Sequence, residues 1–485
     1  MPNFYVQNFG CRATQADGAA LERDLLGRGL SRATTAREAE VVVLNTCTVT
    51  AEADRDVRAA IRRVHRENPG CHILVTGCYA QRAPQELDGL PGVAWVVGNS
   101  HKHRVGAILH DCHPERAALA SEVEPLCGRL SPQAKSRAER GSLEDAERTR
   151  TYVGDIFAHT ELMAAPVFDG LGYDKTRPNL KVQDGCDNRC SFCIIPFVRG
   201  QSRSLPPEDV LREMDSLVAA GFREVVISGI NLGRWGRDLE PASRLENLVR
   251  AILAHTGVER LRLSSIEPMD WTDELIELAA GSPRIAKHAH LPLQTGSDRI
   301  LRGMHRKYRP WHYQERIRRI RAAMPTAAIG ADVMVGFPGE TDAEFEENRR
   351  FIASLPFTYL HVFTYSPRPG TPAAQMPQPV AAEAKRERNR LLRELAARKK
   401  QDFMRSLVGQ TVSTITLSVV ENGRTESLTD NYQKLWLDGR HPANQIISAQ
   451  VREAADDSLV GVIVGASMTR SPADPMYRSP DYIVL

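Results

Sequence analysis

The sequence has no long apolar runs. No window of the 485 residues approaches the roughly 18 apolar residues that a membrane-spanning helix needs. The first residues, MPNFYVQNFGC, lack the basic segment and following apolar run of a secretory leader. We therefore expect a cytoplasmic protein that crosses no membrane. A repeat of fixed period is also absent, so a repeat architecture is not expected.

Neither sign of charge dominates the chain. Its 63 basic and 60 acidic residues leave a net charge of +3, which says little about partners. Two segments, 298–321 and 385–405, are locally basic, and the first also contains Tyr308, Trp311 and Tyr313. Cations suit phosphates and flat rings suit unstacked bases, so a nucleic-acid surface is one interpretation. The solvated face of an amphipathic helix is the alternative, and it is favoured for each segment taken alone.

The apolar pattern predicts an α/β protein with several domains. Strand-length runs at 4–11, 40–47, 72–78 and 93–97 alternate with helical patterns, which predicts a doubly wound parallel sheet over 1–111. The polar stretch 112–176 is interpreted as a linker, partly helical at most. Alternation resumes with expected strands at 224–230, 260–268, 288–294, 328–340 and 359–366, which favours a full or partial β/α barrel over 177–408. Short alternating strands after the second basic segment predict a small all-β barrel over 409–485.

The nine cysteines favour metal binding or catalysis. An odd number of clustered thiols in a long chain argues against a disulfide framework. Cys11, Cys47 and Cys78 each follow one of the first three expected strands, and in a parallel sheet they emerge at one edge. One such thiol alone would be read as a buried, inert cysteine. Three at equivalent positions predict a shared site, and the remaining cysteines are taken as structural or incidental: Cys71, Cys112 and Cys127.

The segment DGCDNRCSFCII places Cys186, Cys190 and Cys193 within eight residues. A structural zinc site needs four protein ligands, and the next candidates, such as His159 and His288, are distant in sequence. An iron–sulfur cube held by three thiolates leaves one iron open to a small molecule. We therefore expect an iron–sulfur cluster with a ligand site at this loop.

These cysteines and several further motifs resemble the radical S-adenosylmethionine (SAM) methylthiotransferases. The resemblance rests on NTCTVT, VTGCYAQ, GCDNRCSFCIIPFVRG, SSIEP, HLPLQTGSDRILRGMHRKY, DVMVGFPGE and HVFTYSPRPGTPAA, and it covers nearly all of the chain outside 112–176. It implies an iron–sulfur domain, a radical SAM barrel and a TRAM-like RNA-binding barrel. Members of the family commonly carry Asn three residues after the first cysteine, where this chain has Thr14, whose hydroxyl can still hydrogen-bond.

The resemblance also implies the cofactors and their ligands. Two 4Fe–4S clusters are expected, one on Cys186, Cys190 and Cys193 with SAM on its open iron, and one that carries sulfur. The second would be held by Cys11, Cys47 and Cys78. Further residues at or near strand ends are candidates for binding SAM, with turn or packing roles as the alternative: Gly229, Ile230, Ser264, Glu267, Gln294 and Asp332.

The implied activity is methylthiolation of tRNA. NTCTVT and LTDNYQKLW resemble the branch that modifies carbon 2 of N6-threonylcarbamoyladenosine beside the anticodon, so the anticodon stem-loop of tRNA is the expected partner. A reductant such as flavodoxin or ferredoxin is also expected, and the sulfur donor stays open. Modification of isopentenyladenosine or of a ribosomal protein side chain is the alternative, and a non-catalytic iron–sulfur RNA-binding or redox protein is a third. Candidate contacts to the substrate carboxylate, or to phosphate at the surface, are Arg199, Arg203, Arg306 and Lys307.

Overall fold

The computed structural model describes residues 2–111, 149–158 and 176–464. The chain forms two compact units, Met1–Lys400 and Gln401–Leu485. Among the described residues, none of the helices combines the length and apolar character that a bilayer crossing requires.

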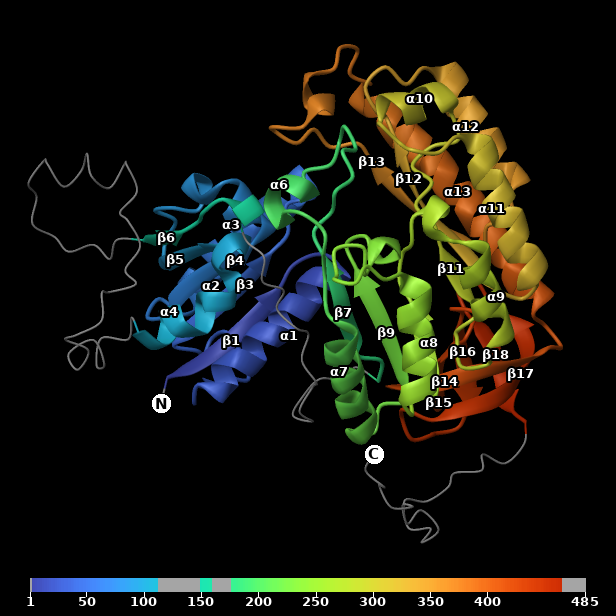
Figure 1. The fold of residues 1–485 in the computed structure, drawn as a ribbon, viewed down its shortest axis with the longest axis horizontal. Coiled ribbons are helices and arrows are strands. Elements are labelled where there is room, and N and C mark those ends of the chain that lie inside the picture. The colour runs from blue at the N-terminus through green and yellow to red at the C-terminus, as the bar shows by residue number, and fades with distance from the viewer. Residues whose placement is uncertain (1, 112–148, 159–175, 465–485) are drawn as a thin grey trace, which may run out of the picture. The chain divides into compact units, whose positions relative to one another are not determined.

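The chain begins with a six-stranded sheet in the order β2-β1-β3-β4-β5-β6, in which every pairing is parallel (Figure 1). All six residues of β3 are buried, as expected for a central strand covered on both faces. Separate apolar clusters lie on the two faces, which confirms the doubly wound sheet. Its elements are β1 (Asn3–Asn8), α1 (Arg12–Gly27), β2 (Ser31–Arg32), β3 (Val41–Thr46), α2 (Ala51–Glu67), β4 (His72–Gly77), α3 (Cys78–Arg82), β5 (Val93–Gly98), α4 (Val105–Asp111) and β6 (Arg150–Tyr152).

Strand β6 lies within the stretch that was interpreted as a linker. Its residue Arg150 pairs with Trp95 of β5, so the chain returns to the sheet after residue 148. Three residues are too few to carry a recognisable alternation, so this strand could not be predicted from the apolar pattern. The rest of the expected linker, 112–148 and 159–175 with Cys112 and Cys127, lies outside the described residues.

The second part of the first unit is a partial β/α barrel, as predicted. Parallel strands run in the order β7-β9-β10 and β11-β12-β13, and a bridge between Leu261 and Ile285 links the two groups. The strands end earlier than expected, so SSIEP, LPLQTGS and GFPGE form loops after β10, β11 and β12. The elements are β7 (Asn179–Asp184), α6 (Ile195–Arg199), β8 (Arg203–Ser204), α7 (Pro207–Ala219), β9 (Glu224–Gly229), α8 (Leu245–His255), β10 (Arg260–Leu263), α9 (Asp273–Gly281), β11 (His288–His290), α10 (Asp298–Gly303), α11 (Pro310–Ala323), β12 (Ala328–Val335), α12 (Asp342–Ser354) and β13 (Tyr359–Thr364).

The basic segment 298–321 divides into α10 and the start of α11. Tyr308 and Tyr313 are buried in the apolar core of the barrel, so they form no nucleic-acid surface. Trp311 is 55% exposed and is the one aromatic ring of this segment that a nucleotide could reach. The second basic segment lies in α13 (Ala382–Ser406).

The second unit contains a closed barrel of five strands in the order β14-β15-β16-β18-β17. Its core is apolar and includes Leu435, Leu437 and Val451, which confirms the predicted small all-β domain. The strands are β14 (Thr411–Glu421), β15 (Arg424–Thr429), β16 (Lys434–Asp438), β17 (Ile446–Ala454) and β18 (Leu459–Ile463).

Candidate functional site

The three N-terminal cysteines lie at one edge of the parallel sheet. Cys11 is the residue before α1, Cys47 directly follows β3, and Cys78 is the first residue of α3 after β4. Gly10 has a φ of +103°, and a Cβ there would lie 2.4 Å from the Cβ of Cys47. Only glycine lets these two loops approach so closely.

The surroundings of these thiols agree with a shared site. Burial and then the nearby thiols of Cys78 and Cys11 raise the pKa of Cys47 to about 12. The Cys11 Sγ lies 3.5 Å from the hydroxyl of Thr14. Thr14 therefore makes the hydrogen-bonding contact that was considered for it in place of the usual Asn. The amide of Asn99 donates to the Sγ of Cys78 at 3.5 Å. The loop that follows β5 thus supports the same site.

The second group of cysteines lies in the loop after β7. The backbone N–H of Asn188 donates to the Sγ of Cys186 at 3.4 Å, and Asn231 lies 3.7 Å from the same sulfur. Burial and then the neighbouring Cys190 raise the pKa of Cys193 to about 12. The loop therefore brings the three cysteines near one another, and their joint role as ligands stays a prediction.

The two groups of cysteines are neighbours in the first unit. Cys78 packs in one apolar cluster with Ile194 and Val198, which lie one and five residues after Cys193. The sheet edge and the cluster loop of the barrel therefore meet.

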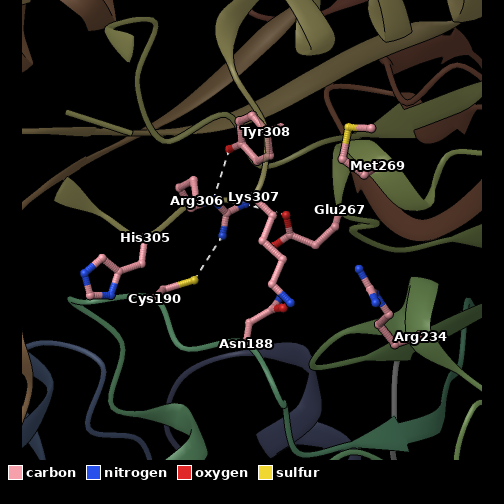
Figure 2. A pocket seen from close by; sticks show the side chains of 9 residues that line it. All are labelled: Asn188, Cys190, Arg234, Glu267, Met269, His305, Arg306, Lys307 and Tyr308. Atoms are coloured by element: carbon pink, nitrogen blue, oxygen red, sulfur yellow. Dashed lines mark hydrogen bonds and ion pairs between the residues drawn. The ribbon is translucent and has the colours of Figure 1, made fainter. Parts of the chain in front are cut away.

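A hollow beside Cys190 is lined by charged side chains (Figure 2). Arg306 lies between Cys190 and Glu267. Its Nη1 donates to the Sγ of Cys190 at 3.3 Å, and its Nη2 pairs with the carboxylate of Glu267. The Nε of Arg306 donates to the Tyr308 hydroxyl at 3.2 Å, and this hydroxyl donates to the carbonyl of Leu293 at 2.7 Å. Burial lowers the pKa of Arg306, but Tyr308, Glu267 and Cys190 outweigh it and hold the pKa well above its usual value. This arginine is a buried, fixed cation, which excludes the surface role considered for it.

The remaining candidate residues lie at the carboxyl ends of the barrel strands. Gly229 ends β9, where a Cβ would lie 2.7 Å from the Oε1 of Gln183, and Ile230 follows it. The buried hydroxyl of Ser264 has no hydrogen-bond partner among the described residues. Gln294 has a φ of +65°, in the left-handed region. A buried polar atom without a protein partner at the carboxyl end of a barrel strand is suited to hydrogen-bond a ligand.

Asp332 points into a cluster of ring side chains. Its Oδ1 lies 3.2 Å from the Nε2 of His290 and 3.3 Å from the Nδ1 of His361. Burial raises the pKa of Asp332, but hydrogen bonds from both imidazoles outweigh it and leave the pKa well below its usual value. The Nδ1 of His290 is also 2.8 Å from the hydroxyl of Tyr359. Asp332 is thus a half-buried, ionised acceptor.

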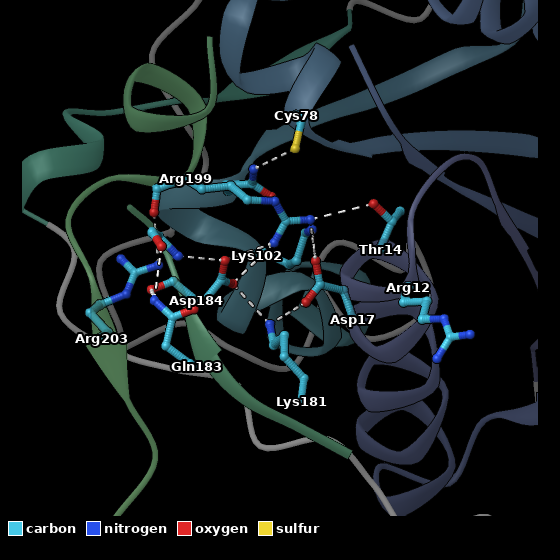
Figure 3. Close-up of polar contacts among 12 residues, drawn as sticks. Arg12, Thr14, Asp17, Cys78, Lys102, Lys181, Gln183, Asp184, Arg199 and Arg203 are labelled. Atoms are coloured by element: carbon cyan, nitrogen blue, oxygen red, sulfur yellow. Dashed lines mark hydrogen bonds and ion pairs between the residues drawn. The ribbon is translucent and has the colours of Figure 1, made fainter. Parts of the chain in front are cut away.

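The sequence interpretation missed a buried network of ionised side chains between the two groups of cysteines (Figure 3). Arg199, considered above as a substrate or surface contact, is only 2% exposed and belongs to it. In β7, NLKVQD, Lys181 alternates with the apolar Leu180 and Val182 as a solvent-facing residue would, so the pattern did not indicate that this charge is buried and paired. The network comprises Asp17, Lys102, Lys181, Asp184 and Arg199.

The donor sets have the chemistry of iron–sulfur sites. All seven cysteines among the described residues are free thiols, six of them in the two groups of three. Thiolates are the usual ligands of 4Fe–4S clusters, and N–H donors around the sulfurs are typical of such sites. Each group therefore fits a cluster held by three cysteines.

Comparison with known proteins gives two family matches. Residues 180–352 match the radical SAM superfamily, and residues 3–98 match the uncharacterized protein family UPF0004. The radical SAM methyltransferase TsrM of Kitasatospora setae, solved with cobalamin and a [4Fe-4S] cluster, has a TM-score of 0.56 at 16% identity, over 77% of this chain and 73% of its own. That likeness shows a shared fold.

Two relatives extend along most of the chain. The threonylcarbamoyladenosine tRNA methylthiotransferase MtaB of Bacillus subtilis is 35% identical over 443 residues, which cover 90% of this chain and 91% of the relative. A tRNA-2-methylthio-N(6)-dimethylallyladenosine synthase of Parafrankia is 34% identical over 442 residues, 90% of this chain and 82% of the relative.

Proposed function

Because the chain belongs to the radical SAM methylthiotransferase family, we propose that it adds a methylthio group to carbon 2 of N6-threonylcarbamoyladenosine in tRNA. The names of several relatives at 30–35% identity support this substrate. The observation that carries the proposal is the meeting of two three-cysteine groups in one unit, since sulfur insertion needs a sulfur-carrying site beside the site of SAM cleavage.

The enzyme uses SAM and two 4Fe–4S clusters, as its family does. Cys186, Cys190 and Cys193 would hold one cluster, and the second would be held by the other three: Cys11, Cys47 and Cys78. When bound, these cofactors supply the one-electron chemistry that an unactivated ring C–H bond requires, which no protein acid or base can provide.

The side chains of this protein bind and orient the reactants. Arg306 holds Glu267 and donates to Cys190, so it keeps a carboxylate and a ligand thiol in fixed positions beside the hollow. Among the described residues Ser264 offers an unpartnered hydroxyl just after β10, and Asp332 offers an ionised carboxylate from within β12. These groups are suited to the hydroxyl and ammonium groups of SAM. Gly229, Ile230 and Gln294 would complete the binding surface at the same end of the barrel.

We assign tRNA, through its anticodon stem-loop, as the partner. The small β barrel supplies an RNA surface on which the ammonium of Lys434 lies 4.6 Å from the ring of Trp436, because a cation and a flat face suit phosphate and base. We further propose that the enzyme receives electrons from a one-electron donor such as flavodoxin or ferredoxin. Its location would be the cytoplasm.

The test gives the reconstituted enzyme matched anticodon stem-loops that carry threonylcarbamoyladenosine or isopentenyladenosine, with SAM and dithionite. Mass spectrometry of the nucleosides should find the methylthio product on the threonylcarbamoyl substrate alone. Product on the isopentenyl substrate alone would assign the protein to the activity named for the Parafrankia relative.

A further inference from the structure

Arg199 is the centre of the buried ionic network (Figure 3). Its Nη1 donates to both oxygens of Asp184 at 3.0 Å, and its Nη2 donates to Asp17 at 3.0 Å. Lys102 donates to Asp17 at 2.9 Å, and Lys181 donates to both carboxylates. The five side chains have exposures of 9% or less. Water therefore does little to screen their charges.

The members of the network lie next to both groups of cysteines. Asp17 is in α1, which begins directly after Cys11, and Asp184 ends β7 just before Cys186. Arg199 ends α6, the helix that follows Cys193, and its Nη2 also lies 3.4 Å from the hydroxyl of Thr14, the residue in contact with Cys11. The network thus joins the N-terminal sheet to the cluster loop of the barrel.

The charges of the network do not cancel. Three cations face two carboxylates, which leaves one positive charge in excess within a buried region. The Nε of Arg199 is buried and has no hydrogen-bond partner among the described residues. The side-chain amide of Asn99 donates to the carbonyl of Val198, the residue before Arg199, at 2.7 Å and to the Sγ of Cys78 at 3.5 Å, which places this cysteine near the arginine. A buried surplus charge and an unpartnered N–H together indicate a missing anion.

A 4Fe–4S cluster on three thiolates carries the negative charge that would balance the positive excess of the network. The three thiolates outweigh the oxidised iron–sulfur core by about one negative charge, and one-electron reduction adds another. We propose that Arg199 is the counter-charge and positioning residue of the cluster on Cys11, Cys47 and Cys78, and that it raises the reduction potential of this cluster. The inference rests on the proposed function, which supplies the cluster.

The experiment isolates this cluster in the full chain. In a background with Cys186, Cys190 and Cys193 replaced by alanine, Arg199→Gln removes the charge and Arg199→Lys keeps it. Arg388→Gln is the matched control, because Arg388 is also buried and pairs with Glu340 at 2.8 Å. Each protein is reconstituted anaerobically, its iron is counted, and its midpoint potential is measured by dithionite titration followed by electron paramagnetic resonance.

Arg199→Gln should retain iron and shift the midpoint potential to more negative values, because a reduced cluster without its counter-charge is harder to form. Arg199→Lys and Arg388→Gln should stay near the parent. An unchanged potential in Arg199→Gln, or the same shift in Arg199→Lys, would overturn the proposal. Arg199→Gln could also hold no iron. In that case, Arg199→Lys with bound iron and a parental potential would support the charge role of Arg199. Loss of iron in both variants would overturn it. A parent without iron would instead contradict the proposed function.

Discussion

Single side chains set the geometry of the SAM-side pocket. Arg306 contacts Cys190, Glu267 and Tyr308 at the same time. Because it is buried, it does not serve as a surface contact to phosphate. Removal of its charge would leave Glu267 unpaired beside a ligand thiol. Charge-assisted hydrogen bonds of this kind contribute about 1.5–3 kcal/mol each.

Arg306→Gln should therefore lower the rate of SAM cleavage by about 10- to 100-fold, since about 1.4 kcal/mol corresponds to tenfold. The measurement is 5′-deoxyadenosine formed in the presence of dithionite. Arg302→Gln is the control, because Arg302 is an exposed residue of α10 whose ion pair is with Asp298 of the same helix. Equal rates in both variants would show that Arg306 does not position the SAM-side groups.

The close approach at Gly10 gives a second prediction at this scale. Gly10→Ala places a Cβ against Cys47, so the reconstituted enzyme should lose about half of its iron, that of the N-terminal cluster, and keep SAM cleavage. Gly29→Ala is the matched control, because Gly29 also has a positive φ, +82°, but no atom lies within 4 Å of its added Cβ. Equal loss of iron in the two variants would mean that backbone strain, and not the clash, acts at Gly10, and full iron in Gly10→Ala would contradict the prediction.

The sequence predicted the cysteine positions because strand ends in a parallel sheet have a fixed geometry. It did not predict the partners of these cysteines. Arg199 and Arg306 look like surface arginines in the sequence, and their burial depends on acids far along the chain, Asp17 and Glu267. Contacts of this range leave no local pattern.

At the scale of elements, helix α12 is stabilised at its first turn. Thr341 and Glu344 form a capping box, and Arg299 of α10 pairs with the same glutamate. The hydrogen bond from Arg299 is the main cause that lowers the pKa of Glu344 from 4.5 to about 2. Folding therefore favours the ionised carboxylate.

The sign of the pH dependence follows from this lowered pKa. The contribution of Glu344 is fully present above pH 4.5 and is lost as the pH falls from 4.5 towards about 2. Glu344→Gln should lower the thermal midpoint at neutral pH and make it fall less steeply over this window. Glu347→Gln, on the same helix, should follow the parent protein. An identical pH profile for Glu344→Gln would mean that the pairing with Arg299 adds no stability.

The sequence predicted where strands and helices occur better than it predicted the residues at which they end. Ile266 of SSIEP is apolar and buried, so the sequence extended β10 through it, but its N–H bonds to the carbonyl of His290 in a loop contact. Burial by packing and burial in a strand give the same apolar signal. The end of β10 could not be read from the pattern for this reason.

For the whole molecule, the main question is where tRNA binds. On the small barrel, Trp436→Ala should weaken binding through loss of base stacking, by about 1–3 kcal/mol. Lys434→Ala should weaken it and reduce the salt slope by about one. Both variants should keep SAM cleavage. Binding is measured by filter retention of tRNA at several salt concentrations.

Trp311→Ala is the counterpart on the first unit, because this ring of α11 is exposed, whereas Trp436 is half-buried. Weakened binding in Trp311→Ala, with parental binding in Trp436→Ala, would move the RNA contact to the basic segment 298–321.

The ionic network also limits how this chain can recombine with its relatives. Asp17 and Lys102 belong to the part of the chain before the barrel, whereas Lys181, Asp184 and Arg199 belong to the barrel. A hybrid whose barrel lacks Lys181 and Arg199 keeps two of the five residues, and Asp17 is then buried with Lys102 as the one cation that remains of its three partners. The two parts match separate families, yet an exchanged barrel should fit this sheet only when it supplies counterparts of Lys181, Asp184 and Arg199.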